Sequence, residues 1–409
     1  MNITSKIVAL SSAVAFALQI ALALLMLRYF SPEEVGMFSV ISQIGFFWTT
    51  LALAQTPLRL LANHGASVFE DARHAWVSSL QRFVWLSPLA ALAVWWSGLS
   101  FVNALLWALL LSLFQLTWML AQSMRLRMVG VWAQAGVRVL PPLMALLVAV
   151  VAVFMEWSGP ALLAAALLGY AVGAAWLLPS LLAYWQAKFV NVSTEPNEVA
   201  LSSALHDPSH VVIAPVYGDN RSATLRMAHT LADALLATAI VVVWQRMYGA
   251  QETGWMAAPL RVMGFMPAVV HMAWAQVMLA QPQHASTNPL WVGLAGFASV
   301  ALMGAGCAVA LEIGWLGDQW QGMWPYLLPL AVWQGSACMV AAFSFNSFRF
   351  KSATHYSKLC IFTALIQSTS IFYPFIFNLK INLEVHLHSF VIISLVCYLR
   401  LYIYSSKLS

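Results

Sequence analysis

The chain carries very little charge for its length. Only 8% of its 409 residues are Asp, Glu, Lys or Arg, while 62% are hydrophobic. So few charges exclude a soluble globular protein, because this much apolar surface cannot be hidden in one core and must face lipid. Long hydrophilic segments are equally scarce, since one polar stretch, 185–227, is the longest break between apolar runs. The function must therefore be sought inside the bilayer.

Cysteine is rare, and the common catalytic patterns are missing. The four cysteines lie in apolar runs and never at metal-ligand spacing, so we expect neither a disulfide framework nor a zinc site. No histidine is followed by aspartate five positions on, no aspartate by another two positions on, and no His-Glu-x-x-His occurs. The obvious acyltransferase, sugar-nucleotide and zinc-protease patterns are thus absent. We expect a protein that is not an enzyme and has no cofactor or metal.

What the chain does have is a series of apolar runs long enough to cross a membrane. A span needs about 20 residues to cross ~30 Å of hydrocarbon, and lipid forces the backbone into helices. We therefore predict an all-α polytopic membrane protein with about 12 transmembrane helices. The predicted spans are 7–27, 35–57, 83–99, 101–121, 137–155, 160–184, 228–248, 254–280, 290–313, 323–346, 358–377 and 385–404.

The spans divide into two sets of six. We predict an N-terminal six-helix bundle over 1–184, a cytoplasmic linker over 185–227 and a C-terminal six-helix bundle over 228–409. The composition changes after about residue 348, because neither Gly nor Trp occurs in that segment. With both termini in the cytoplasm, all but four of the 19 Lys and Arg fall inside, which is the bias of membrane proteins. The net charge of +5 then favours anionic lipid headgroups and not nucleic acid.

The two halves share a short motif. Arg28, Glu34 and Gly36 follow the first span, and Arg246, Glu252 and Gly254 follow the seventh at the same spacing, 218 residues later. Since six spans separate the copies, both lie on one side of the membrane, and the repeat is parallel. Two bundles facing each other across a central cavity is the arrangement that this predicts. For the motif itself a structural role is favoured, in which it starts a helix and allows close packing.

From Arg28 to Phe38 the chain reads Arg-x-x-Ser-Pro-Glu-Glu-x-Gly-x-Phe. This stretch, with the 6+6 layout, resembles the polysaccharide-biosynthesis branch of the multidrug/oligosaccharidyl-lipid/polysaccharide exporter superfamily, the flippases of O-antigen and related lipid-linked oligosaccharides. The resemblance covers residues 1–345 in outline. It implies that an undecaprenyl-diphosphate-linked sugar crosses the bacterial inner membrane by alternating access. It also implies H⁺ or Na⁺ as candidate coupling ions, and a glycan polymerase and a chain-length regulator as candidate partners.

Several arginines are candidates for a phosphate-bearing substrate. Related lipid II flippases carry arginines on the first, second and eighth helices, and Arg28, Arg59 and Arg261 occupy those helices here. Arg261 lies about 10 Å inside the predicted eighth span, where an arginine is costly unless it faces protein or a wet cavity. Snorkelling to the headgroups is the alternative for Arg261, and lipid anchoring is the alternative for Arg59. Arg246, at the place of Arg28 in the second half, completes the set.

Each of the other polar side chains within the spans has two interpretations. Gln43, Gln55 and Gln115 can bind sugar hydroxyls or join helices, and His271 can be a ligand or a satisfied core residue. Asp233, one turn after His229, is the candidate carboxylate for ion coupling, although a salt-bridged helix start explains the pair equally well.

These residues lead to one predicted function and two alternatives. We expect a flippase for a lipid-linked oligosaccharide, with an ion-coupled drug or metabolite antiporter of the same superfamily as the first alternative. A membrane-embedded glycan polymerase is the second, although such an enzyme usually needs a large outer loop and the outer loops here are short. A cationic cavity favours the diphosphate substrate, and a carboxylate-rich cavity favours cationic drugs.

Overall fold

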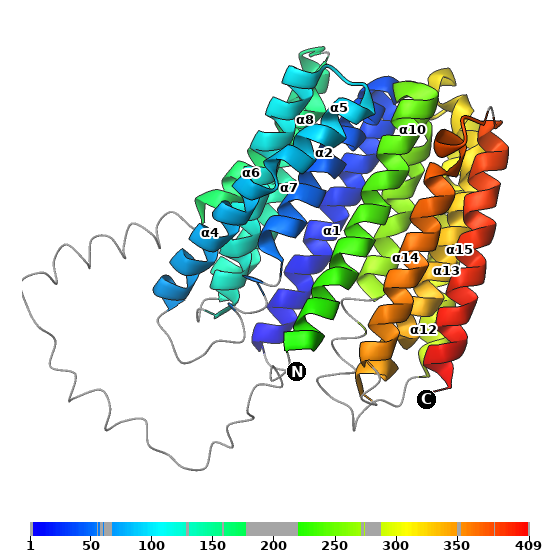
Figure 1. The fold of residues 1–409 in the computed structure, drawn as a ribbon. Helices are drawn as coiled ribbons and strands as arrows, with labels where there is room; N and C mark the ends of the chain where they lie inside the picture. Colours follow the sequence, from blue (N-terminus) through cyan, green and yellow to red (C-terminus); the bar gives the residue numbers. More distant parts are fainter. Residues whose placement is uncertain are drawn as a thin grey trace, which may run out of the picture.

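The computed structural model is a bundle of long helices that run side by side (Figure 1). It describes residues 3–54, 56–57, 60, 68–127, 131–157, 159–176, 220–270, 274, 288–349, 353–379 and 381–407. The helices are α1 (Ile3–Tyr29), α2 (Pro32–Leu53), α4 (Val68–Trp85), α5 (Ser87–Ser97), α6 (Phe101–Arg127), α7 (Val131–Phe154), α8 (Ala161–Ala175), α10 (Asn220–Val269), α12 (Pro289–Glu312), the 3₁₀ helix η3 (Asp318–Met323), α13 (Trp324–Arg349), α14 (Ala353–Ile376) and α15 (Leu383–Ser406).

The prediction of an all-α polytopic membrane protein is confirmed. Nine helices among the described residues are long and apolar enough to cross a membrane, and α4 with α5, bent by 48°, forms a tenth candidate span. The apolar helix α8 follows the predicted sixth span over its 15 described residues. Linker residues 185–219 lie outside the described residues, whereas 220–227, predicted as linker, are the first turns of α10.

The helix α10 contains both the seventh and the eighth predicted spans. Its 50 residues would measure about 75 Å as one straight helix, more than twice the thickness of the hydrocarbon layer. The chain turns back at Gly249, whose φ of 89° and ψ of 178° are not helical and lie in a region open to glycine. Two antiparallel passes result, and Figure 1 shows them as neighbouring green ribbons.

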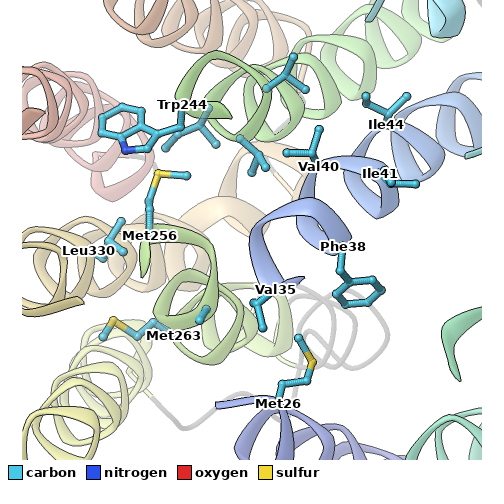
Figure 2. Packing of buried hydrophobic residues seen from close by; sticks show 14 of the residues in the cluster. Met26, Val35, Phe38, Val40, Ile41, Ile44, Trp244, Met256, Met263 and Leu330 are labelled. Carbon is cyan, nitrogen blue, oxygen red and sulfur yellow. The ribbon is translucent and has the colours of Figure 1, made fainter. Parts of the chain in front are cut away.

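All spans have their ends at two faces of the bundle. The first turn of α1 and the last turn of α15 lie at the same face, which we call the terminal end (Figure 1). The Gly249 turn, the start of α2 and the start of α15 lie at the opposite face, the far end. The two six-helix bundles meet mainly where α2 packs along α10. Figure 2 shows the side chains of this contact, with Val35 and Val40 of α2 among those nearest to α10.

The first copy of the motif starts α2. Ser31 is the N-cap, and its hydroxyl accepts a hydrogen bond from the Glu34 N–H at 3.3 Å. The Glu34 carboxylate accepts from the Ser31 N–H in return, at 2.9 Å, so the pair is a complete capping box. Pro32 occupies the first turn, where its missing N–H costs nothing. The structural role expected for this copy is therefore present.

The two copies of the motif also contact each other, and each copy supplies both a glycine and a carbonyl oxygen to the contact. A Cβ on Gly36 would overlap the carbonyl oxygen of Ala250, and a Cβ on Gly254 would overlap the carbonyl oxygen of Pro32. Positions 32 and 250, like 36 and 254, are equivalent under the 218-residue repeat, so the two contacts are related by an approximate two-fold axis. We call this backbone contact the far-end seal. This reciprocal contact is the strongest structural support for the parallel repeat.

The compositionally distinct C-terminal segment is part of the C-terminal bundle. The α14 helix packs against α10, and α15 packs against α13. Phe390 of α15 is fully buried and meets the indole ring of Trp333 edge-on at 4.8 Å between ring centroids. Because these side chains complete a core that begins before residue 348, the change in composition does not mark a structural boundary.

Candidate functional site

A cavity of about 420 Å³ extends from the middle of α1, at Phe16, toward the far end, at Met26. Its walls come from α1, α2, α6, α7, α8 and the second pass of α10, so both bundles contribute. Most of the lining is apolar or aromatic, and the polar side chains that reach it are Gln19, Gln115, Tyr170 and Arg261. We call it the Arg261 cavity.

Arg261 is the charged group of this cavity. Its Nη2 donates a hydrogen bond to the Ser42 hydroxyl at 2.6 Å, and its guanidinium lies 4.4 Å from the centre of the Phe38 ring. Ser42 comes ten residues after the start of α2, which places it about 15 Å from the far end of that helix. The side chain is exposed and lines the cavity at that depth. Ser42 and the ring of Phe38 fix the guanidinium while part of its donor fork stays available for a ligand.

A proline pair in α7 positions one aromatic wall. Pro141 has no N–H, so the carbonyl of Val137, four residues earlier, loses its helical donor. The indole N–H of Trp118 on α6 fills that place and donates to the Val137 oxygen at 2.9 Å. Trp118 then stacks on Tyr170 of α8 with 5.5 Å between ring centroids.

The opposite wall joins the two bundles. Phe16 of α1 and Phe265 of α10 stack at 4.1 Å with an angle of 13° between their planes. One turn nearer the terminal end, Arg138 of α7 donates to the Ser12 hydroxyl of α1 at 3.0 Å. Flat aromatic faces beside a cation are suited to a ligand that combines sugar rings with a phosphate group.

The predicted site residues do not all meet in this cavity. Arg261 and Gln115 line it, and Gln43 lies outside its lining on α2. Arg59, Gln55 and His271 lie outside the described residues.

Arg28 and Arg246 lie at the far end, on opposite sides of the contact between the bundles. Arg28 donates to the carbonyl of Trp315 and packs on its ring, while the Arg246 guanidinium lies against Gly98. The first contact reaches from the N-terminal bundle to the loop before η3, and the second reaches from the C-terminal bundle to the loop after α5. These arginines thus form a reciprocal pair, like the seal glycines.

Asp233 and His229 form an ion pair at 3.2 Å on the first pass of α10. The Asp233 side chain is 61% exposed, and neither residue lines the Arg261 cavity. Among the described residues, no group of three or more His, Cys, Asp or Glu side chains is arranged to hold a metal ion.

Sequence reasoning missed the aromatic residues that shape the cavity, above all Phe16, Trp118, Tyr170 and Phe265. Aromatic residues are common in membrane helices, so their type alone gives no signal. The Pro141–Pro142 pair did carry a signal in the sequence, because a proline inside a span frees a carbonyl that a neighbouring helix must satisfy.

Comparisons with known proteins agree with this architecture. No protein-family description matches the chain, and no curated protein sequence matches it either. Among solved structures, the lipid II flippase MurJ in its inward closed conformation is similar, with 12% identity, a TM-score of 0.59, and coverage of 99% of this chain and 87% of that one. An inward-facing multidrug resistance MATE family transporter of the MOP superfamily matches at 12% identity and a TM-score of 0.46, over 100% of this chain and 94% of the transporter, too distantly to add to the argument. The first likeness shows that the chain has the overall fold of that flippase.

Proposed function

We propose that this protein moves a lipid-linked oligosaccharide that carries a diphosphate from one leaflet of a bacterial inner membrane to the other. The observation that carries the proposal is Arg261, a cation held at mid-membrane depth and exposed to a cavity with aromatic walls. A guanidinium at that depth is expensive, and a phosphate ligand in a wet cavity offsets its cost. The fold shared with a lipid II flippase is in keeping with this function.

The charge of the cavity weighs against a carrier of cationic drugs. None of the described residues that line it is an aspartate or glutamate. Asp233 is exposed and bound to His229 elsewhere on α10. We keep Asp233 and His229 as candidates for coupling to H⁺ or Na⁺, where an exposed carboxylate inside a span remains accessible to ions.

The proposal is tested with purified protein in lipid vesicles. We expect the protein to speed the appearance of a polyprenyl-diphosphate-linked sugar in the opposite leaflet, measured with a membrane-impermeant sugar-cleaving enzyme. A polyprenyl-monophosphate-linked sugar should cross more slowly, because it offers the cavity one phosphate fewer. Equal rates for both lipids, or faster uptake of a cationic dye than of either lipid, would contradict the proposal.

The orientation makes a separate prediction. If the terminal end faces the cytoplasm, reporter fusions after Gln186 and His284 will be cytoplasmic, and fusions after Trp157 and Asp318 will be periplasmic. Reporter enzymes that are active in one compartment only provide the measurement. A periplasmic signal after Gln186 would contradict both the orientation and the even number of spans in the first bundle.

A further inference from the structure

A second polar cluster lies at the far end of the C-terminal bundle, away from the Arg261 cavity. The indole N–H of Trp244 donates to the Tyr326 hydroxyl at 3.2 Å, and that hydroxyl donates to the Glu252 carboxylate at 2.8 Å. The Tyr248 hydroxyl lies 2.9 Å from Nδ1 of His386. Three of these residues belong to α10, and the other two belong to α13 and α15. We call this group the far-end network.

The hydrogen bonds of His386 define the tautomer of its neutral ring. The side chain is 1% exposed and stacks on Trp244 at 4.7 Å between ring centroids. Its Nε2 lies 3.1 Å from the carbonyl oxygen of Ile371, which can only accept, so Nε2 carries a hydrogen. In the neutral ring Nδ1 is then an acceptor, and the Tyr248 hydroxyl donates to it. In the neutral ring, both nitrogens of His386 therefore have hydrogen-bond partners.

A proline in α14 leaves a backbone carbonyl without its helical donor close to this ring. Pro374 lies inside α14 and has no N–H, so the carbonyl of Ser370, one turn earlier, lacks its helical donor. His386 faces the backbone of Ser370 as well as that of Ile371. The imidazole N–H thus donates to the α14 backbone in the same turn where the proline removed a donor.

One more proton would reverse the Tyr248 bond. A proton that binds Nδ1 from water turns this nitrogen from an acceptor into a donor, and the Tyr248 hydroxyl must rotate to accept from it and find another acceptor. The titratable groups closest to His386 are Tyr248, which is bonded to it, Tyr373 in the same cavity, and Glu384 and His388 on its own helix. Tyr326 and Glu252 follow through Trp244. Glu252 joins the network through Tyr326, whose hydroxyl donates to the Glu252 carboxylate and accepts from Trp244, the residue that stacks on His386.

A second cavity reaches the ring. This cavity of about 610 Å³ lies between α14 and α15, and most of its lining is apolar. The polar side chains in the lining are His386 and the hydroxyl residues Thr369, Ser370, Tyr373 and Ser389. His386 lies in the first turn of α15, so this cavity lies close to the far end. His386 therefore lies much nearer to the far end than to the terminal end.

The network holds the turn that makes the seal. Tyr248 and Glu252 stand on either side of Gly249, and the seal positions Ala250 and Gly254 lie within the same seven residues. We propose that His386 is a proton-binding site, and that its protonation loosens the Gly249 turn and weakens the far-end seal between α2 and α10. This inference rests on the proposed transport function and adds to it the group through which protons control access from the far end.

The test measures how accessible the seal is at different pH values. Val35 of α2 is fully buried at the seal, so a V35C variant should react with an impermeant maleimide only when the far end opens. The exposed position Glu33 gives the matched variant E33C, which corrects for the pH dependence of thiol reactivity. The four native cysteines are buried and provide a low background. The ratio of V35C to E33C labelling should rise about fivefold or more from pH 8 to pH 5.5.

His386→Gln separates proton binding from structure. The amide offers an NH₂ donor group and a carbonyl acceptor, where the neutral ring offers one N–H and one acceptor nitrogen, but the amide takes no proton in this range. We expect the labelling ratio in His386→Gln to stay at its pH 8 value down to pH 5.5. A wild-type ratio that does not change with pH, or a His386→Gln ratio that rises like that of the wild type, would overturn the proposal. Since labelling needs no substrate, it can succeed when the vesicle flipping assay fails, so the two proposals fail separately.

Discussion

Arg261→Ala is expected to abolish export of the surface glycan while the protein reaches its normal level in the membrane. The guanidinium contributes charge-assisted hydrogen bonds to phosphate, and losing bonds of this kind costs about 1.5–3 kcal/mol each. That energy corresponds to a decrease of about tenfold to a hundredfold in rate for each bond to phosphate. Folding should tolerate the change, because Arg261 lines an existing cavity and the Ser42 hydroxyl keeps its hydrogen bond to the Ser39 carbonyl.

Two further variants identify what Arg261 supplies. Arg261→Lys should restore export only in part, because an ammonium group lacks the planar fork that matches two phosphate oxygens. Arg400 provides a matched control, since its guanidinium also lies over an aromatic ring, 5.8 Å from the centre of Phe362, but outside the cavity lining. Cells that carry Arg400→Ala should export the surface glycan normally. Glycan staining at the cell surface, with protein level measured on the same cells, distinguishes these outcomes.

Normal export by Arg261→Ala at wild-type protein level would contradict the cationic cavity. Arg261 would then be a packing residue that the membrane tolerates. A second arginine prediction concerns Arg59, whose position near the end of the second predicted span allows lipid anchoring to replace it. Arg59→Ala should therefore reduce export less than Arg261→Ala does.

Much of the fold could be predicted from hydropathy, because lipid imposes the same demand on every span. The Gly249 turn shows what this signal cannot give. A single residue separates two passes, and its backbone angles, not its polarity, reverse the chain. The 218-residue spacing of the motif indicated the repeat, but the reciprocal packing of Gly36 and Gly254 depends on two backbones that meet in space.

The site was predictable only where a residue was costly in the membrane. Arg261 stood out for that reason, and the structure places it in a cavity. Arg28 and Arg246 carried the same charge, yet they lie in the contacts between the bundles, because nothing in their local sequence distinguishes a loop contact from a ligand contact. His386 gave no signal at all, since the partners that define its tautomer come from other helices, α10 and α14.

Alanine at Gly36 or Gly254 is expected to lower the thermal stability of the protein markedly and to stop export. The atom that an added methyl group meets is a backbone carbonyl oxygen in each case, so no side chain can rotate to make room. The helices α2 and α10 must move apart, and overpacking of this kind costs about 1–3 kcal/mol. Gly306 of α12 is the matched control, because a Cβ there meets no atom within 4 Å. Gly306→Ala should leave stability unchanged or raise it by up to about 1 kcal/mol, as alanine favours a helix.

The double variant Gly36→Ala/Gly254→Ala tests whether the two contacts form one seal. The approximate two-fold axis relates them, so a separation of α2 from α10 that admits one methyl group also makes room for the other. The loss of stability in the double variant should therefore be smaller than the sum of the two single losses, by about 0.5–3 kcal/mol. Melting curves of the purified protein in one detergent provide the comparison. If the two losses add fully, the glycines act as independent packing sites, and the far-end seal does not move as a unit.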